Sequence, residues 1–97
     1  MSQRVGGRRH LLDIYYDILN VTQNEIIITH ICGPANLNLN NIHRYLDVLL
    51  KLDLMRKRSV PYGGRTYYYR TEKGNEFMKH YDALNIIIID NKLTEAS

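Results

Sequence analysis

The length of 97 residues predicts one small domain, and the formal net charge at pH 7 is a modest +3. The longest purely aliphatic run, Ile86 to Ile89, is far too short to span a membrane. The first ten residues lack the apolar stretch of a secretion signal. A single cysteine, Cys32, excludes an internal disulfide and a multi-cysteine zinc site. We therefore expect a cytoplasmic protein in a reducing compartment.

Basic residues are concentrated between positions 51 and 70. That segment sums to +5, whereas residues 1–50 sum to zero and residues 71–97 sum to −2. Its basic side chains, opposed by Asp53 alone, are Lys51, Arg56, Lys57, Arg58, Arg65 and Arg70. Charge gathered on one segment is typical of a phosphate-binding surface. The alternative is a solvated edge hairpin whose arginines prevent edge-to-edge strand pairing.

The N-terminal part predicts an arm followed by a core helix. Residues 1–7 are polar and contain glycine, which predicts a flexible arm. A helix is predicted from Arg8 to Asn20, because apolar side chains recur on one face. That face consists of Leu11, Leu12, Tyr15, Ile18 and Leu19, with Asp13, Asp17 and Asn20 off it.

The second element carries conflicting signals. The run from Thr22 to Glu25 matches a capping box, which marks a helix start. The isoleucines after it favour a strand by propensity. We predict a helix from Gln23 to Cys32, ended by Gly33 and Pro34. Residues 34–37 then form a turn, with Leu37 packed into the core.

The third element is the strongest helix of the chain. Asn38 is a good N-cap, and Ile42, Leu46, Leu49 and Asp53 recur at helical spacing. Leu39, Leu50 and Leu52 widen this apolar stripe, with Tyr45 at its edge. Polar residues occupy the other face: Asn40, Asn41, Arg44, Asp47 and Lys51. Two helices joined by a turn and followed by a basic hairpin predict an α+β fold, the winged helix-turn-helix, whose third helix enters the DNA major groove.

The hairpin, or wing, is predicted to consist of two short strands and a turn. Residues 54–60 and 65–70 are the strands, and Pro61 to Gly64 supply turn chemistry. Successive strand residues point to opposite faces, so Tyr67 and Tyr69 share one side and Tyr68 lies on the other. One of these sides is expected to pack on the helices.

The last segment predicts a helix with two apolar sides. Thr71 can cap it, and Phe77, Tyr81, Leu84 and Ile88 follow at the spacing of a coiled-coil seam. One side can cover the winged domain, and the other can pair with a second subunit through Tyr81, Leu84, Ile87 and Ile88. The alternative is that Ile86 to Ile89 form a short strand or a tail. The expected organisation is thus an arm (1–7), a winged domain (8–71) and a dimerisation helix (72–97).

The third helix, the hairpin and the motif Thr71-x-Lys73-Gly74-x-x-Phe77 resemble small archaeal winged helix-turn-helix proteins of the chromatin-associated and transcription-regulator type. The resemblance spans Leu11 to Leu84, and the threonine–lysine–glycine motif is its most specific part. It implies a homodimer that binds double-stranded DNA and pairs through a C-terminal helix. It also points to an archaeal host, or to one of its viruses or plasmids. This chain departs from that pattern in its short, isoleucine-dense C-terminal segment.

The expected DNA contacts fall on two elements. On the third helix they are Asn38, Asn40, Asn41, His43, Arg44 and Lys51, since asparagine pairs with adenine and arginine with guanine. On the wing they are Lys57, Arg58, Tyr62 and Arg65, which would lie along phosphates. His30, Cys32 and His43 lack the spacing and the fourth ligand of a zinc site. No catalytic residue, cofactor, metal or small-molecule substrate is expected.

The leading hypothesis is a homodimeric transcriptional regulator. Two alternatives stay open: an architectural DNA-binding protein with little sequence preference, and a winged helix that binds only protein. The basic hairpin argues against the second alternative. An enzyme is the least supported function.

Overall fold

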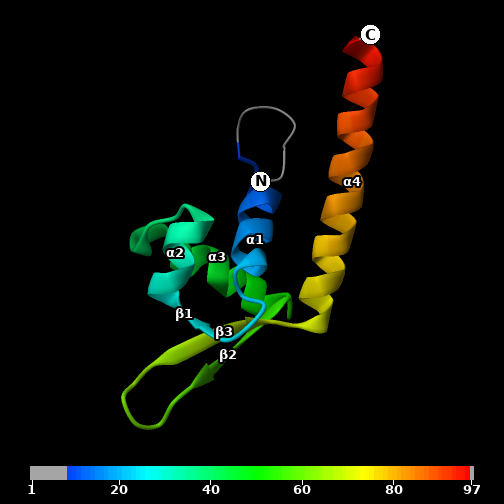
Figure 1. Cartoon of the computed structure of the whole chain (residues 1–97). Coiled ribbons are helices and arrows are strands. Elements are labelled where there is room, and N and C mark those ends of the chain that lie inside the picture. Colours follow the sequence, from blue (N-terminus) through cyan, green and yellow to red (C-terminus); the bar gives the residue numbers. More distant parts are fainter. Residues whose placement is uncertain (1–8, 97) are drawn as a thin grey trace.

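The computed structural model describes the backbone of residues 9–96 and the side chains of residues 9–88 (Figure 1). The elements are α1 (Leu11–Asn20), β1 (Ile26–Ile27), α2 (Ile28–Ala35), α3 (Leu39–Lys51), β2 (Met55–Ser59), β3 (Thr66–Arg70) and α4 (Glu72–Ala96). α1 lies between α4 on one side and α2 with α3 on the other, and the hairpin projects below them. This is the predicted winged helix-turn-helix, with a third strand added. The predicted arm, residues 1–7, lies outside the described residues.

The core lies where α1, α2 and α3 meet the sheet. Its largest fully buried apolar side chains come from these helices and from the sheet: Ile18, Leu19, Ile31, Ile42, Leu46, Leu49 and Met55. Burying each large apolar side chain contributes about 1.5–3 kcal/mol before ordering costs. The predicted apolar stripe of α3 is confirmed at Ile42, Leu46 and Leu49, but Leu39 and Leu52 at its two ends are about half exposed.

The predicted core face of α1 is correct at Tyr15, Ile18 and Leu19 and wrong at its start. Leu11 and Leu12 are exposed because the first turn of α1 lies beyond the core, towards α4. Asp13 was predicted off the core face and is buried instead. Its carboxylate accepts hydrogen bonds from the His10 backbone N–H, at 2.8 Å, and from the Tyr81 hydroxyl of α4. These two donors offset the cost of burying the carboxylate.

The predicted helix from Gln23 to Cys32 is wrong at both ends. Ile26 and Ile27 form β1, which pairs antiparallel with Tyr68 and Tyr67 of β3, so the β-branched propensity prevailed over the capping box. α2 starts only at Ile28 and continues through Gly33 and Pro34. The left-handed stop is Asn36, at φ 55°, rather than the glycine. Its N–H donates to Gly33 O and the Leu37 N–H to Cys32 O, which satisfies two of the last carbonyls of α2.

α3 begins as predicted. Asn38 is its N-cap, and the Asn38 side-chain oxygen accepts from the Asn41 N–H at 2.9 Å. The helix ends at Lys51, and Asp53 follows at φ 60°, a left-handed conformation that aspartate tolerates better than most residues. This turn directs the chain into β2.

The sheet has the order β1-β3-β2. β2 and β3 pair antiparallel in the register Met55↔Arg70 to Ser59↔Thr66. Residues opposite one another share a face, so Lys57 and Tyr68 lie on one side, and Arg58 and Tyr67 on the other. Tyr68 packs against the core, which makes its side the inner face. The predicted turn is confirmed, with Gly63 and Gly64 at positive φ.

The threonine–lysine–glycine motif joins the wing to α4. The Thr71 hydroxyl donates to Asp53 O at 2.6 Å and accepts from the Gly74 N–H at 3.0 Å, so it caps α4 as predicted. A Cβ at Gly74 would lie 2.3 Å from Leu54 O, which only glycine can avoid. The motif therefore fixes where α4 leaves the winged domain.

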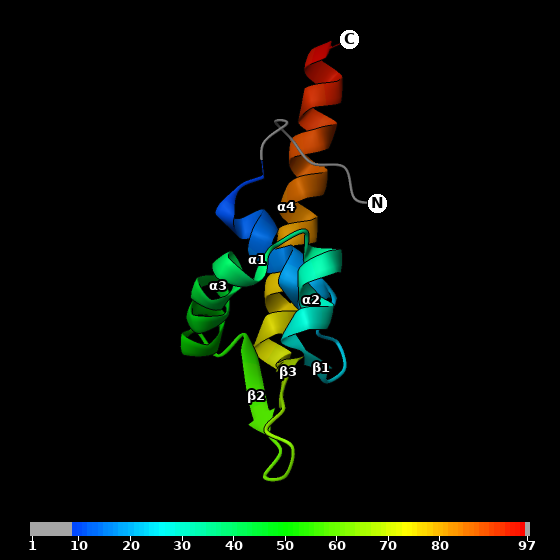
Figure 2. The ribbon, with the colours of Figure 1, turned by 90° about the vertical axis from the view of Figure 1, so that its left-hand side faces the viewer.

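α4 is a continuous helix of 25 residues. The alternative of a strand or tail at 86–89 is wrong. The C-terminal segment, described as short from the sequence, forms one long helix. At 1.5 Å per residue the helix is about 37 Å long. Its C-terminal half rises beyond the rest of the molecule (Figures 1 and 2).

Candidate nucleic-acid interface

The polar face of α3 is open to solvent. Asn40, Asn41, His43, Arg44 and Lys51 are all exposed. α3 lies directly above the hairpin (Figure 2). Asn38 is exposed too, but its side-chain oxygen is engaged in the cap, which leaves the amide N–H₂ as its free group. Arg44 lies over the Tyr45 ring, 4.8 Å from the centroid, and donates to the Tyr45 hydroxyl at 2.9 Å. Tyr45 therefore holds Arg44 along the helix surface.

A groove separates α3 from the wing. It has a volume of 340 Å³, with His43 on one wall and Arg65 and Thr66 on the other. Thr29 of α2 and Tyr68 of the inner face complete its polar lining. Burial, and next the negative charge of Asp47, raise the pKa of the Tyr68 hydroxyl, which therefore stays neutral. The groove brings together a predicted helix residue and a predicted wing residue.

Thr29, Thr66 and Asp47 were not among the predicted contacts. Thr29 comes to the groove because α2 begins at Ile28, after β1, and β1 was not foreseen from the sequence. The sequence could have suggested Thr66 and Asp47, although only weakly. Thr66 begins a wing strand, and Asp47 lies on the polar face of α3.

The basic segment divides into bound and unbound cations. Arg56 pairs with Asp53 at 2.9 Å, and Arg58 binds Glu25 through two hydrogen bonds of 2.7 and 2.8 Å. Arg70 is also engaged: its guanidinium donates to Leu19 O at the end of α1. Within the part of the chain that the structure describes, no acid pairs with the three remaining cations, Lys51, Lys57 and Arg65. The positive charge of this segment that is available to a ligand therefore lies on these three exposed residues.

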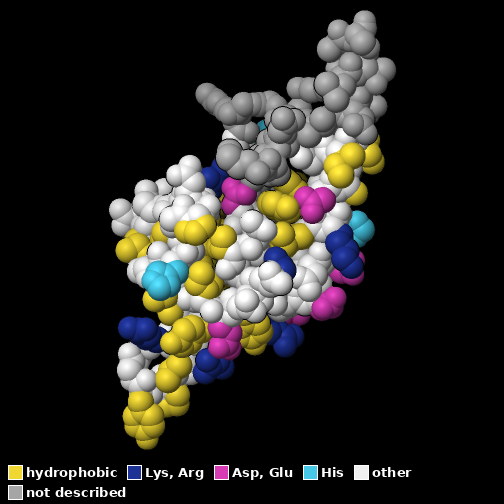
Figure 3. All heavy atoms as spheres, viewed as in Figure 1, with side chains coloured by type: hydrophobic (Ala, Val, Ile, Leu, Met, Phe, Trp, Pro, Cys, Tyr) yellow, Lys and Arg dark blue, Asp and Glu magenta, His cyan; other side chains and the backbone are white. Residues whose placement is uncertain are grey.

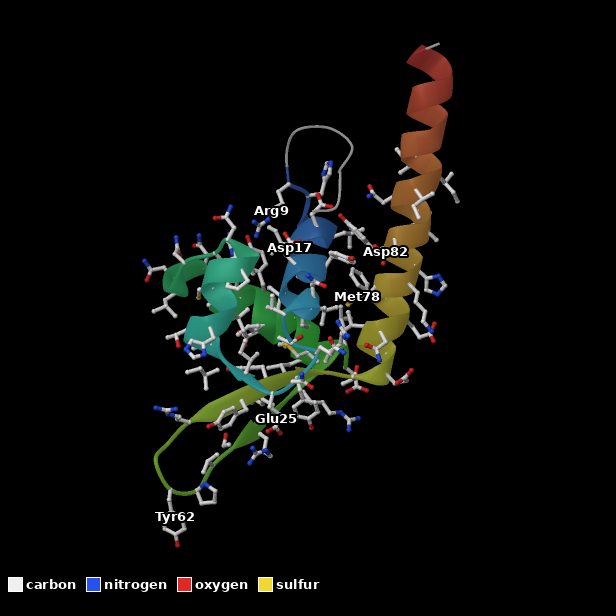
Figure 4. The ribbon with its side chains drawn as sticks, in the orientation of Figure 1. Arg9, Asp17, Glu25, Tyr62, Met78 and Asp82 are labelled. Atoms are coloured by element: carbon white, nitrogen blue, oxygen red, sulfur yellow. The ribbon has the colours of Figure 1, made fainter. Side chains whose placement is uncertain are left out.

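The two paired arginines lie on the outer face of the sheet, opposite Tyr69 and Tyr67. Hydrogen bonds from these arginines lower the pKa of Glu25 and of Asp53 below their usual values. Basic side chains lie around an acidic one at the base of the hairpin, and apolar side chains cover its tip (Figure 3). Tyr62 at this tip is 91% exposed and points away from the molecule (Figure 4).

Arg9 belongs to the scaffold. Its guanidinium donates to Ala35 O at 2.6 Å and to Asn36 O at 3.4 Å, and it lies 3.6 Å from Asp17 (Figure 4). A cation at the C-terminal end of a helix is favourable, because the last carbonyls carry partial negative charge. Arg9 thereby ties the start of α1 to the turn before α3.

The predicted dimer residues lie on α4 with unequal exposure. Tyr81 is partly buried, its ring stacked on Tyr16 at 4.3 Å between centroids. Leu84, Ile87 and Ile88 are 59%, 55% and 43% exposed. Leu84 and Ile88 line an apolar groove of 360 Å³ between α4 and α1, together with Leu12, Phe77 and Tyr81.

Two further features bear on the site. None of the helices, over the residues described, is long and apolar enough to cross a membrane. Among those same residues, His, Cys, Asp and Glu form no group of three that could hold a metal ion.

The comparisons with known proteins agree with this geometry. The sequence matches the family model for winged helix-turn-helix proteins over residues 8–88. Among curated proteins, none matches the sequence. The structure is similar to Sso10a-2, a DNA-binding protein from Sulfolobus solfataricus, with a TM-score of 0.75 and 28% identity over 91% of this chain and 88% of that one.

Two other solved structures share the fold at lower identity. The PcaV transcriptional regulator from Streptomyces coelicolor has a TM-score of 0.68 and 17% identity, over 86% of this chain and 60% of its own. The protein smu.1704 from Streptococcus mutans UA159 has a TM-score of 0.70 and 18% identity, over 97% of this chain and 94% of its own.

Proposed function

Because the chain belongs to the winged helix-turn-helix family, we propose that it is a transcriptional regulator that binds double-stranded DNA as a homodimer. In this proposal α3 enters the major groove, and the wing lies along the phosphate backbone. The similarity to Sso10a-2, a DNA-binding protein, supports the choice of ligand.

One observation carries the proposal: two exposed cations without acidic partners among the described residues, Lys51 and Arg65, lie on α3 and across a groove from it. Lys57 and Arg65 belong to the wing, and Arg65 shares a groove with His43 of α3. Unpaired cations next to a helix that presents asparagine and arginine suit a duplex, because phosphates need charge and base edges need hydrogen-bond donors and acceptors.

Each α3 contact has a proposed role. Asn40, Asn41, His43 and Arg44, in the first turns of α3, reach base edges, and the Asn38 amide lies beside them. Lys51 at the end of α3 contacts phosphate, as do Lys57, Arg65 and the Tyr62 hydroxyl on the wing. Arg58, the remaining predicted wing contact, is bound to Glu25.

Dimerisation would proceed through the outer half of α4. Leu84, Ile87 and Ile88 expose apolar surface on a helix that extends beyond the winged domain. Two such helices can bury this surface against each other, with Tyr81 contributing only its exposed edge. A two-fold dimer then reads two half-sites about 10 bp apart, or a multiple of that, in a pseudo-palindromic operator.

Selection of bound duplexes from a random pool, followed by footprinting, tests the proposal. A regulator should enrich a two-fold symmetric sequence and bind it about 10³-fold or more tightly than random duplex. Binding without enrichment would favour the architectural alternative. No binding to any duplex at low salt would contradict DNA binding altogether and leave the protein-interaction module.

A further inference from the structure

The ion pair between Glu25 and Arg58 bridges the whole sheet. Glu25 directly precedes β1 and Arg58 belongs to β2, with β3 between these two strands. The Arg58 guanidinium lies 5.3 Å from the centroid of the Tyr67 ring on β3 and forms both hydrogen bonds to the Glu25 carboxylate. Arg58 is therefore folded over the outer face of the sheet rather than extended towards solvent.

The inner face differs in this respect. Lys57, the neighbour of Arg58 in β2, points to the inner face and has no acidic partner among the described residues. Arg65 in the groove beside α3 is in the same situation. Two adjacent residues of one strand thus have opposite electrostatic environments, and Glu25 makes the difference.

We propose that Glu25 limits non-specific DNA binding by holding Arg58 away from the phosphate backbone. This inference rests on the proposed function, since it concerns the same duplex. An arginine offers five N–H donors in a fork that fits phosphate as well as carboxylate, so Glu25 and a backbone phosphate compete for one guanidinium. The hydrogen bonds from Arg58 lower the pKa of Glu25, so the carboxylate remains charged throughout the neutral range.

The consequence is that the affinity for DNA of unrelated sequence stays low. Each phosphate contact adds about 0.9 to the slope of log affinity against log salt, whatever the bases. Without Glu25, Arg58 gains the freedom to make one more such contact from the wing. With Glu25 present, the residues of α3 that contact bases determine which DNA sequence is preferred.

The experiment measures the affinity of the full chain for a random duplex over a range of salt concentrations. Glu25→Gln removes the charge and keeps the size of the side chain. It should raise the affinity for random duplex about five- to tenfold near 0.1 M salt and steepen the slope by about one unit. The double variant Glu25→Gln/Arg58→Gln removes both charges and should bind like the wild type.

Glu76→Gln is the matched control. Glu76 is an exposed glutamate paired with Lys79 on α4, so this variant makes the same change in net charge far from the wing. It should leave the salt slope unchanged. The inference is overturned if Glu25→Gln leaves affinity unchanged or lowers it, if Glu76→Gln raises it equally, or if the double variant binds more weakly than the wild type. A wild type that binds no duplex would overturn the proposed function itself.

Discussion

The winged domain and the outer half of α4 solve the problem of apolar surface in different ways. In the winged domain, Ile18, Ile42 and Leu49 are fully buried among elements of the same chain. On α4, Phe77 and Tyr81 still contact this domain, but Leu84, Ile87 and Ile88 are 43–59% exposed. The first region therefore buries its apolar surface within one chain, whereas the second leaves apolar surface exposed, which is why we propose it as the dimer interface.

The largest effect is expected from charging that surface. Replacing Leu84 and Ile88 with aspartate should give a monomer or an unfolded chain, because the charges cannot be buried between two helices. DNA affinity should then be largely lost. The solution mass at micromolar concentration measures this.

Ile86→Asp is the control for this prediction, because Ile86 is equally exposed on α4 but does not line the groove with Leu84 and Ile88. It should remain dimeric. A monomeric wild type, or a double variant that stays dimeric, would show that another surface forms the dimer.

The second prediction concerns the junction of the two regions. Gly74→Ala places a Cβ against Leu54 O and the Arg70 side chain, so the backbone must shift. The free energy of unfolding should fall by about 1–3 kcal/mol, measured by chemical denaturation. Gly33→Ala, where a Cβ meets nothing within 4 Å, should change it by less than about 1 kcal/mol. Equal effects would mean that the junction does not fix α4.

Base reading by the winged domain is tested at Arg44. Arg44→Ala should weaken binding to the selected operator by about 1–3 kcal/mol and relax the preference at one base position. Binding to random duplex should change little. The affinities for both duplexes, measured side by side, decide between base and phosphate contact, since equal losses would assign Arg44 to phosphate.

Backbone contact by the wing gives the smallest effect. Arg65→Ala should lower affinity for every duplex alike and reduce the salt slope by about one unit. Arg56→Ala is its counterpart, because Arg56 is bound by Asp53 on the outer face, and its slope should stay as in the wild type. An unchanged slope for Arg65→Ala would mean that the groove beside α3 does not contact the DNA backbone.

The sequence predicted the elements whose signals are local. α3 has its cap, its apolar spacing and its polar face within one stretch, and the hairpin has its glycine turn. β1 could not be predicted, because a two-residue strand exists only through its pairing with β3, far along the chain. The predicted stop at Gly33 and Pro34 was also wrong, because it is Asn36 that adopts the left-handed conformation and ends α2.

The candidate site was predictable in its residue types and unpredictable in its charge balance. Arg58, Arg65 and Lys57 look alike in the sequence. Only the fold brings Glu25 to Arg58 across β3, while Arg65 faces His43 across a groove. Likewise Arg9 and Arg70 hydrogen-bond to helix-end carbonyls that no spacing rule identifies.

The most direct test is a comparison of affinities for a selected operator and for random duplex, titrated with salt, using the wild-type chain. A sequence-specific regulator with these wing cations should show a ratio of about 10³ or more, and both affinities should fall steeply as salt increases. Equal affinities for the two duplexes would contradict sequence-specific regulation. Affinities that do not respond to salt would contradict the role of the wing cations.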